Sequence, residues 1–172
     1  MKTPILFLLP PFAQILLIAV LPFTSADLVG STCNRTPYPV FCAAALRVDP
    51  RSSTADTKTL GLIMVDQVRG HAKSILTRIK YLRGKVPHPM TKLALSSCEH
   101  SYRIIISAMV PPSKEGLMKG DYKFTVEYMN AAANDALECE AGFGGSKSAL
   151  SDSNDYVRKA ALVASAIASL LL

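Results

Sequence analysis

The stretch Gly120-Asp121-Tyr122-Lys123-Phe124 is the point about which the helices of this chain are arranged. It lies between two helical segments, each with one cysteine, Cys98 before the stretch and Cys139 after it. Gly120 stands where a left-handed residue commonly ends a helix, so we expect the chain to reverse there. If the two sulfurs pair, they close a 42-residue loop and remove about 4 kcal/mol of unfolded-chain entropy. The stretch would then be the presented tip of a stapled helical hairpin.

The strongest helical pattern precedes the tip and runs from Arg51 to Gly84. Ser52, Ser53 and Thr54 offer hydroxyl groups for an N-cap. Gly84 and the prolines that follow it stop the pattern. Apolar residues recur at steps of three and four, at Leu60, Met64, Val68, Ala72, Ile75, Ile79 and Leu82. The opposite face is basic, which we interpret as a solvated helix face, and it carries Arg69, Lys73, Arg78, Lys80, Arg83 and Lys85.

Three more helices follow from the same periodicity, over Pro89–Lys119, Phe124–Ala141 and Ser148–Leu172. Pro111-Pro112 must kink or break the first of these, because each ring removes a backbone donor and crowds the preceding turn. We find no alternating strand pattern of useful length. The sequence therefore predicts an all-α, up-down-up-down four-helix bundle.

The N-terminal region divides into a leader and a small hairpin. Lys2, an apolar run and the small residues Thr24-Ser25-Ala26 are typical of a signal peptide over residues 1–26. A membrane anchor is disfavoured because Pro10 and Pro11 would interrupt its helix. Removal of 26 of the 172 residues leaves 146, the size of one domain over residues 27–172. Within it we expect an N-terminal hairpin over 27–50 and the bundle over 51–172.

The chain has four cysteines, Cys33, Cys42, Cys98 and Cys139, and all lie in the expected mature part. An even count in a secreted chain indicates two disulfides, although spacing alone leaves three connectivities open. No pair has the short Cys-x2-Cys spacing that a zinc site favours, so we expect no metal.

The last segment admits a second interpretation. Small residues near 144–146 or 151–153, a polar spacer through Lys159 and the apolar tail Ala160–Leu172 resemble a lipid-anchor signal. The same residues also fit the periodicity of a bundle's last helix, which we prefer. We therefore expect no membrane partner unless this tail is such a signal.

Neither the net charge nor the glycosylation sequon identifies a binding partner. The formal charge of +6 falls to +5 without Lys2, and a secreted protein meets acidic wall polysaccharide before nucleic acid. We expect no nucleic-acid partner and interpret the excess charge as a solvated surface. Asn34-Arg35-Thr36 is a formal N-glycosylation sequon at Asn34.

Motifs of catalysis are missing. There is no Gly-x-Ser-x-Gly, no His-Glu-x-x-His and no phosphate loop. His71, His88 and His100 do not have metal-ligand spacing, and Glu138 and Glu140 cannot share one helical face. The sequence predicts no enzyme, no catalytic residue and no cofactor.

The stretch 120–124 and the segment Thr59-Leu60-Gly61-Leu62-Ile63-Met64-Val65-Asp66 carry a resemblance to a known family. With the four cysteines and the helical pattern, the mature chain resembles the plant inhibitors of invertase and pectin methylesterase. Both segments are similar to the invertase (beta-fructofuranosidase) inhibitor branch. The resemblance implies a four-helix bundle with an N-terminal helical hairpin. It also implies the disulfides Cys33–Cys42 and Cys98–Cys139.

In the invertase-inhibitor branch the tip is Pro-Lys-Phe, and it enters the active-site cleft of the invertase. Lys123 and Phe124 match this motif, while Tyr122 stands in the place of proline. The resemblance thus implies an inhibitory turn made of Asp121, Tyr122, Lys123 and Phe124. Loss of the preset proline dihedral costs about 0.4 to 1 kcal/mol, so we expect weaker or re-tuned inhibition and not its absence.

The implied partner is an acid invertase of the cell wall or vacuole. One alternative is a pectin methylesterase that binds the bundle helices, and another is a lipid-anchored wall protein without inhibitory activity. We expect secretion to the apoplast or cell wall, with the vacuole as the alternative.

Overall fold

The computed structural model describes residues 27–145 and 147–172, so the signal peptide expected over residues 1–26 lies outside the described part. All regular structure within these ranges is helical. The elements in chain order are α1 (Leu28–Cys33), α2 (Pro39–Arg47), the 3-10 turn η1 (Pro50–Thr54), α3 (Thr57–Arg83), α4 (Pro89–Ile104), the π turn η2 (Ile105–Met109), α5 (Val110–Lys119), α6 (Tyr122–Ala141) and α7 (Ser151–Ser169).

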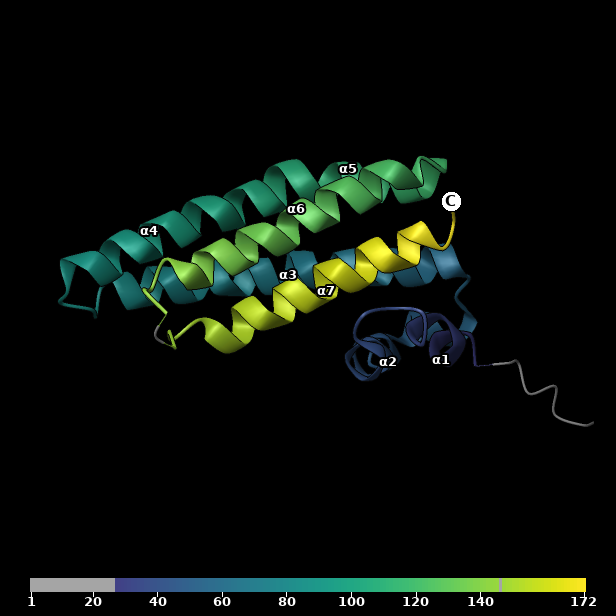
Figure 1. The fold of residues 1–172 in the computed structure, drawn as a ribbon, viewed down its shortest axis with the longest axis horizontal. Coiled ribbons are helices and arrows are strands. Elements are labelled where there is room, and N and C mark those ends of the chain that lie inside the picture. Colours follow the sequence, from purple (N-terminus) through teal and green to yellow (C-terminus); the bar gives the residue numbers. More distant parts are fainter. Residues whose placement is uncertain (1–26, 146) are drawn as a thin grey trace, which may run out of the picture.

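Four rods form the bundle, namely α3, the α4–η2–α5 rod, α6 and α7, while α1 and α2 lie at its side (Figure 1). The predicted all-α four-helix bundle is confirmed. α7 packs along both α3 and α6. α6 and α7 each bury small residues, which let helix backbones approach closely, among them Ala132, Ala136, Ala160 and Ala164.

The start of α3 differs from the expectation. The hydroxyl residues Ser52, Ser53 and Thr54 lie in the η1 turn, so none of them caps the helix. Asp56 does so instead, because its carboxylate accepts a hydrogen bond from the Thr59 backbone N–H at 2.7 Å. Pro50 begins the separate η1 turn with Asp49 as its N-cap, so the hydroxyl residues belong to that turn and α3 begins only at Thr57.

The predicted interruption at Pro111-Pro112 is confirmed, in the form of a π turn and not a break. The rod of α4, η2 and α5 continues past the prolines (Figure 1), and the wider turn Ile105–Met109 is followed by Val110 and then by Pro111. A π turn admits one extra residue per turn, which accommodates a site where prolines cannot donate. Ser113, which is buried, donates its hydroxyl to the Met109 carbonyl at 2.8 Å and satisfies that acceptor.

The C-terminal tail is the fourth rod of the bundle. Six of its residues are buried in the core, so loss of this segment would open the bundle: Ala160, Ala161, Val163, Ala164, Ile167 and Ala168. None of the helices in residues 27–145 and 147–172 combines the length and the apolar character that a membrane crossing requires.

Two disulfides join Cys33 to Cys42 and Cys98 to Cys139, which is the connectivity that the resemblance implied. The first closes the α1–α2 hairpin. The second joins α4 to α6. The hairpin docks on the bundle through aromatic contacts, because the Phe41 ring meets the edge of Tyr156 with ring centroids 5.0 Å apart.

Candidate functional site

The tip joins α5 to α6 and is shorter than the sequence suggested. Gly120 has a φ of 87°, the left-handed conformation expected of it, and it reverses the chain together with Asp121. Helix α6 already begins at Tyr122. The expected turn over residues 120–124 is therefore wrong in extent, since Tyr122, Lys123 and Phe124 form the first turn of a helix. One left-handed glycine suffices to end α5, so the next residues can start α6.

This helical turn holds three side chains in different environments. Tyr122 is half-buried and packs against the hydrophobic core, so it anchors the turn. Lys123 is exposed and forms no ion pair with any described residue. Phe124 leaves 51% of its surface exposed, although large apolar side chains are usually buried. The molecule thus presents an ammonium group and an aromatic ring from consecutive residues at one end of the bundle.

Close packing of α5 against the start of α6 holds the tip. Gly116 is buried, and a Cβ atom there would lie 2.8 Å from the Asp121 carbonyl oxygen. The Thr125 hydroxyl, also buried, donates to the Ser113 carbonyl at 2.8 Å. These two contacts position the first turn of α6 on α5. Sequence analysis did not identify either residue as part of the site.

The segment Thr59–Asp66 supports this end of the bundle from α3. Gly61 is buried and leaves room for Leu117 of α5, whose side chain would meet a Cβ atom at 3.1 Å. The Asp66 carboxylate accepts hydrogen bonds from Lys114 at 2.8 Å and from Arg51 at 3.1 Å. The segment therefore fastens α5, and the tip that follows it, to the longest helix.

A shallow hollow of about 250 Å³ adjoins the Phe124 ring. On its rim Lys119 pairs with Glu115 at 2.6 Å, and this hydrogen bond raises the pKa of Lys119. Two acidic residues, Glu115 and Asp121, thus line the hollow beside the Phe124 ring. The hollow is lined by Pro112, Glu115, Gly116, Lys119, Asp121, Phe124 and Tyr128.

The disulfide Cys98–Cys139 does not clamp the tip, contrary to the stapled-tip prediction. Cys139 follows Tyr122 by 17 residues along α6, which corresponds to about 26 Å at the helical rise. The bond therefore staples the opposite end of the bundle. Packing against Gly116 and Thr125, and not a covalent bond, shapes the tip.

The three histidines of the chain differ in their burial. His71 is half-buried and stacks on Tyr156 with ring centroids 3.6 Å apart, and burial lowers its pKa. His88 and His100 are exposed. Within residues 27–145 and 147–172 no three His, Cys, Asp or Glu side chains gather as metal ligands would. Asn34 is exposed at the end of α1, where a glycan would meet solvent.

The fold and this end of the bundle define a class, small disulfide-bonded helical bundles that expose a lysine and a phenylalanine at one end and gather no metal-ligand cluster among their described residues. Comparison with known proteins makes the class specific. The family described as plant invertase/pectin methylesterase inhibitor matches residues 27–167, and the chain belongs to it. The resemblance noted in the sequence is thereby confirmed. Members of this family are inhibitors and not enzymes.

Two relatives represent the two kinds of inhibitor in the family's description, one of each kind. The chain is 37% identical over 123 residues to cell wall / vacuolar inhibitor of fructosidase 1 of Arabidopsis thaliana, covering 72% of this chain and 59% of the relative. It is 32% identical over 118 residues to a pectinesterase inhibitor of Actinidia deliciosa, covering 69% and 63%. The chain thus spans about six-tenths of the length of these relatives.

A solved structure shares the fold. The crystal structure of mutant form A of a pectin methylesterase inhibitor from Arabidopsis superposes with a TM-score of 0.74 and covers 86% of this chain and 99% of that one. The two sequences are 20% identical, so this likeness concerns the arrangement of helices alone.

Proposed function

We propose that this protein is a secreted inhibitor of plant acid invertase and that it inserts Tyr122, Lys123 and Phe124 into the sucrose-binding cleft. The observation that carries the proposal is the exposure of Lys123 beside Phe124 on the first turn of α6. A side chain that extends from the end of a narrow rod can enter a cleft that the flank of the bundle cannot enter.

The chemistry of the target suits such a tip. Retaining glycosidases use two closely spaced carboxyl groups, a nucleophile and a general acid. The Lys123 ammonium would donate charge-assisted hydrogen bonds to them, in competition with sucrose. Each such bond contributes about 1.5 to 3 kcal/mol. The Phe124 ring adds apolar contact beside the ammonium, and aromatic side chains commonly anchor interfaces in this way.

The similarity to a cell wall / vacuolar inhibitor of fructosidase favours an invertase as target and the apoplast, cell wall or vacuole as location. Similarity to a pectinesterase inhibitor supports a second candidate, inhibition of pectin methylesterase through the bundle helices. The two candidates make different predictions for the tip, since only the first requires Lys123.

The test is a titration of the oxidised protein, residues 27–172, against an acid invertase and a pectin methylesterase at mildly acidic pH. Lys123→Ala should raise the inhibition constant for invertase about 10- to 150-fold, the equivalent of one charge-assisted bond. Lys147→Ala is a matched control, because Lys147 is also exposed and its Asp152 partner is almost fully exposed. Its inhibition constant should stay unchanged.

Both variants should keep the melting temperature of the parent, because neither lysine is buried. Equal inhibition of invertase by Lys123→Ala and the parent would refute the tip mechanism. Inhibition of the methylesterase alone, insensitive to Lys123, would establish the second candidate instead.

A further inference from the structure

Charge is unevenly distributed along this chain. Residues 67–98 contain seven lysines or arginines and not one aspartate or glutamate. They form the second half of α3, the α3–α4 turn and the first half of α4. The expected mature chain has a charge of only +5, so the rest of it carries a net negative charge. The cations therefore gather in one half of the bundle and are not spread as a general surface excess.

Four of these cations form a stripe along α3. Arg69, Lys73, Lys80 and Arg83 are separated by four, seven and three residues, and all are exposed. At 3.6 residues per turn these positions fall on one face of the helix. The stripe extends over the 14 helical steps from Arg69 to Arg83, or about 21 Å of helix axis. It is long enough to contact several repeating units of an extended chain at once.

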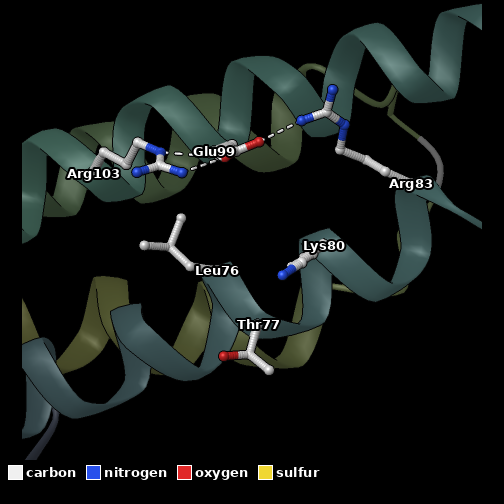
Figure 2. Close-up of a pocket in the computed structure, with 6 residues that line it drawn as sticks. All are labelled: Leu76, Thr77, Lys80, Arg83, Glu99 and Arg103. Carbon is white, nitrogen blue, oxygen red and sulfur yellow. Dashed lines mark hydrogen bonds and ion pairs between the residues drawn. The ribbon is translucent and has the colours of Figure 1, made fainter.

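Helix α4 provides a second wall beside the stripe. Figure 2 shows Arg103 and Glu99 of α4 in a line with Arg83, while Leu76 points from α3 toward them and Lys80 extends from the same helix beside it. Together with Thr77 these residues line a hollow of about 550 Å³ between the two helices. We call this hollow and the α3 stripe the basic groove. Glu99 is the single acid of its lining, against three cations.

Glu99 orients the two arginines without saturating them. Its carboxylate accepts one hydrogen bond from Arg83 at 2.5 Å and two hydrogen bonds from Arg103 at 2.7 and 3.2 Å. Hydrogen bonds from Arg103 and Arg83 hold the pKa of Glu99 below its ordinary value, so it stays ionised in mildly acidic medium. A guanidinium offers five N–H donors, so each arginine keeps free donors for a second carboxylate.

We propose that the basic groove binds an acidic polysaccharide, a linear chain of uronic acid residues, and holds the protein on it. Repeating carboxylates match a line of cations, and guanidinium groups bind carboxylates through paired N–H donors. The hollow has no aromatic lining on which the bases of a nucleic acid would stack. Its walls rise from two helices, which suits an extended chain better than a flat membrane.

The hollow of the basic groove is lined by the C-terminal part of α3 and by α4, whereas the tip joins α5 to α6 at the other end of the bundle (Figure 1). Lys80 follows Gly61, which contacts α5 below the tip, by 19 residues, or about 28 Å along α3. A polysaccharide in the groove therefore leaves the tip accessible. The groove would concentrate the protein in an acidic matrix while the tip binds its own partner.

The experiment measures binding of the oxidised mature protein to de-esterified polygalacturonate oligomers by calorimetry in low salt. Lys73→Gln/Lys80→Gln/Arg103→Gln should weaken binding about tenfold, since three exposed charge pairs are lost. The matched control is Arg35→Gln/Arg78→Gln/Lys85→Gln, which removes the same charge. Arg78 lies on the other face of α3, and Lys85 follows the helix, both within 6 Å of the Tyr81 ring. This control should weaken binding less than about threefold.

Fully methyl-esterified polygalacturonate should bind at least about tenfold more weakly than the acid form, because it lacks the carboxylates. Equal losses in the two triple variants would show that net charge alone attracts the polymer and would overturn the groove. Tighter binding of single-stranded DNA with the same number of charges would overturn the choice of ligand. The assay contains no enzyme, so its outcome does not depend on the role of the tip.

Discussion

The two ends of the bundle are held together by different means. At one end the disulfide Cys98–Cys139 ties α4 to α6 beside a buried hydrogen-bond chain. Tyr102 donates to Asn154 at 2.8 Å, and Asn154 donates to Glu140 at 2.7 Å. At the other end neither disulfide joins α5 to α6. The tip there is held by the close approach that Gly116 allows and by the Thr125 hydrogen bond.

The two ends therefore influence different properties of the protein, namely the stability of the fold and the position of the tip side chains. A crosslink acts mainly on the unfolded chain and stabilises the whole fold wherever it is placed. A glycine contact acts on local geometry and decides where the next side chains point. We infer that the stapled end determines how stable the bundle is, whereas the packed end determines how Lys123 and Phe124 are presented.

Removal of the staple should have the largest effect on stability. Cys98→Ala/Cys139→Ala should lower the free energy of unfolding by about 4 kcal/mol, the chain-entropy value for a loop of this length. Urea unfolding measures this change. Inhibition of invertase, assayed where the variant is still folded, should stay within about twofold, because the tip lies at the other end.

The control for the staple is Cys33→Ala/Cys42→Ala, whose bond spans a sequence separation of 9 in place of 41. The shorter loop should cost only about 3 kcal/mol. If the Cys98 and Cys139 variant lost inhibition while folded, the staple would shape the tip after all, and the separation of the two ends would be refuted.

A substitution at the packed end should instead weaken inhibition strongly and lower stability less than removal of the staple. In Gly116→Ala the new methyl group would lie 2.8 Å from the Asp121 carbonyl, so the start of α6 must shift. Overpacking of this kind costs about 1 to 3 kcal/mol of stability. Inhibition of invertase should fall by at least about tenfold, although Lys123 and Phe124 are intact. Inhibition constants and urea unfolding of the same sample give both numbers.

Gly70→Ala is the matched control, since Gly70 is exposed in α3 and a Cβ atom there meets nothing within 4 Å. Alanine should stabilise that helix by about 0.5 to 1 kcal/mol and leave inhibition unchanged. Full inhibition by Gly116→Ala would show that the tip tolerates displacement and that packing does not position it.

The sequence predicted the features that depend on local signals. Periodicity predicted the four rods, and Gly120 predicted the reversal, because both signals are local. The distance between staple and tip was also available, since 17 residues of helix separate Tyr122 from Cys139. The sequence did not single out Asp56 as the N-cap of α3, because the serines before it are equally suited to that position.

Contacts between distant segments could not be predicted. Gly116 and Asp121 approach only because the chain reverses at Gly120, and nothing in the spacing marks Gly116 as special. Tyr102 and Asn154 are 52 residues apart, and a hydrogen bond at that separation depends on the register of packed helices. The connectivity of the disulfides came from the family resemblance, since spacing left three possibilities.

The stapled end should also confer a pH dependence on stability. Burial alone would raise the pKa of Glu140, but hydrogen bonds from Ser151, Asn154 and Ser148 outweigh it and leave the pKa below its ordinary value of 4.5. The carboxylate therefore stabilises the fold above about pH 4.5, and this contribution is lost as the pH falls through the lowered pKa. Glu140→Gln should flatten the decline of the melting temperature between pH 5 and 3.

Glu138→Gln is the control for this titration, because Glu138 is exposed two residues away on the same helix. Its melting temperature should follow the parent across the same pH range. An unchanged acid limb in Glu140→Gln would mean that the hydrogen-bond chain contributes nothing to the acid stability of this end.

The smallest effect is expected at Tyr122, the first residue of α6. Proline suits the first position of a helix, because its fixed φ is already helical and the missing N–H has no partner within the helix. Tyr122→Pro should therefore fold normally and gain about 0.4 to 1 kcal/mol from a less flexible unfolded tip.

The tyrosine ring, however, packs against the core, so proline also removes a contact that anchors the turn. If rigidity of the backbone limits inhibition, the inhibition constant falls two- to fivefold, and if the ring contact limits it, the constant rises by a similar factor. The sign of this change shows whether the packed end holds its tip through the backbone or through the side chain.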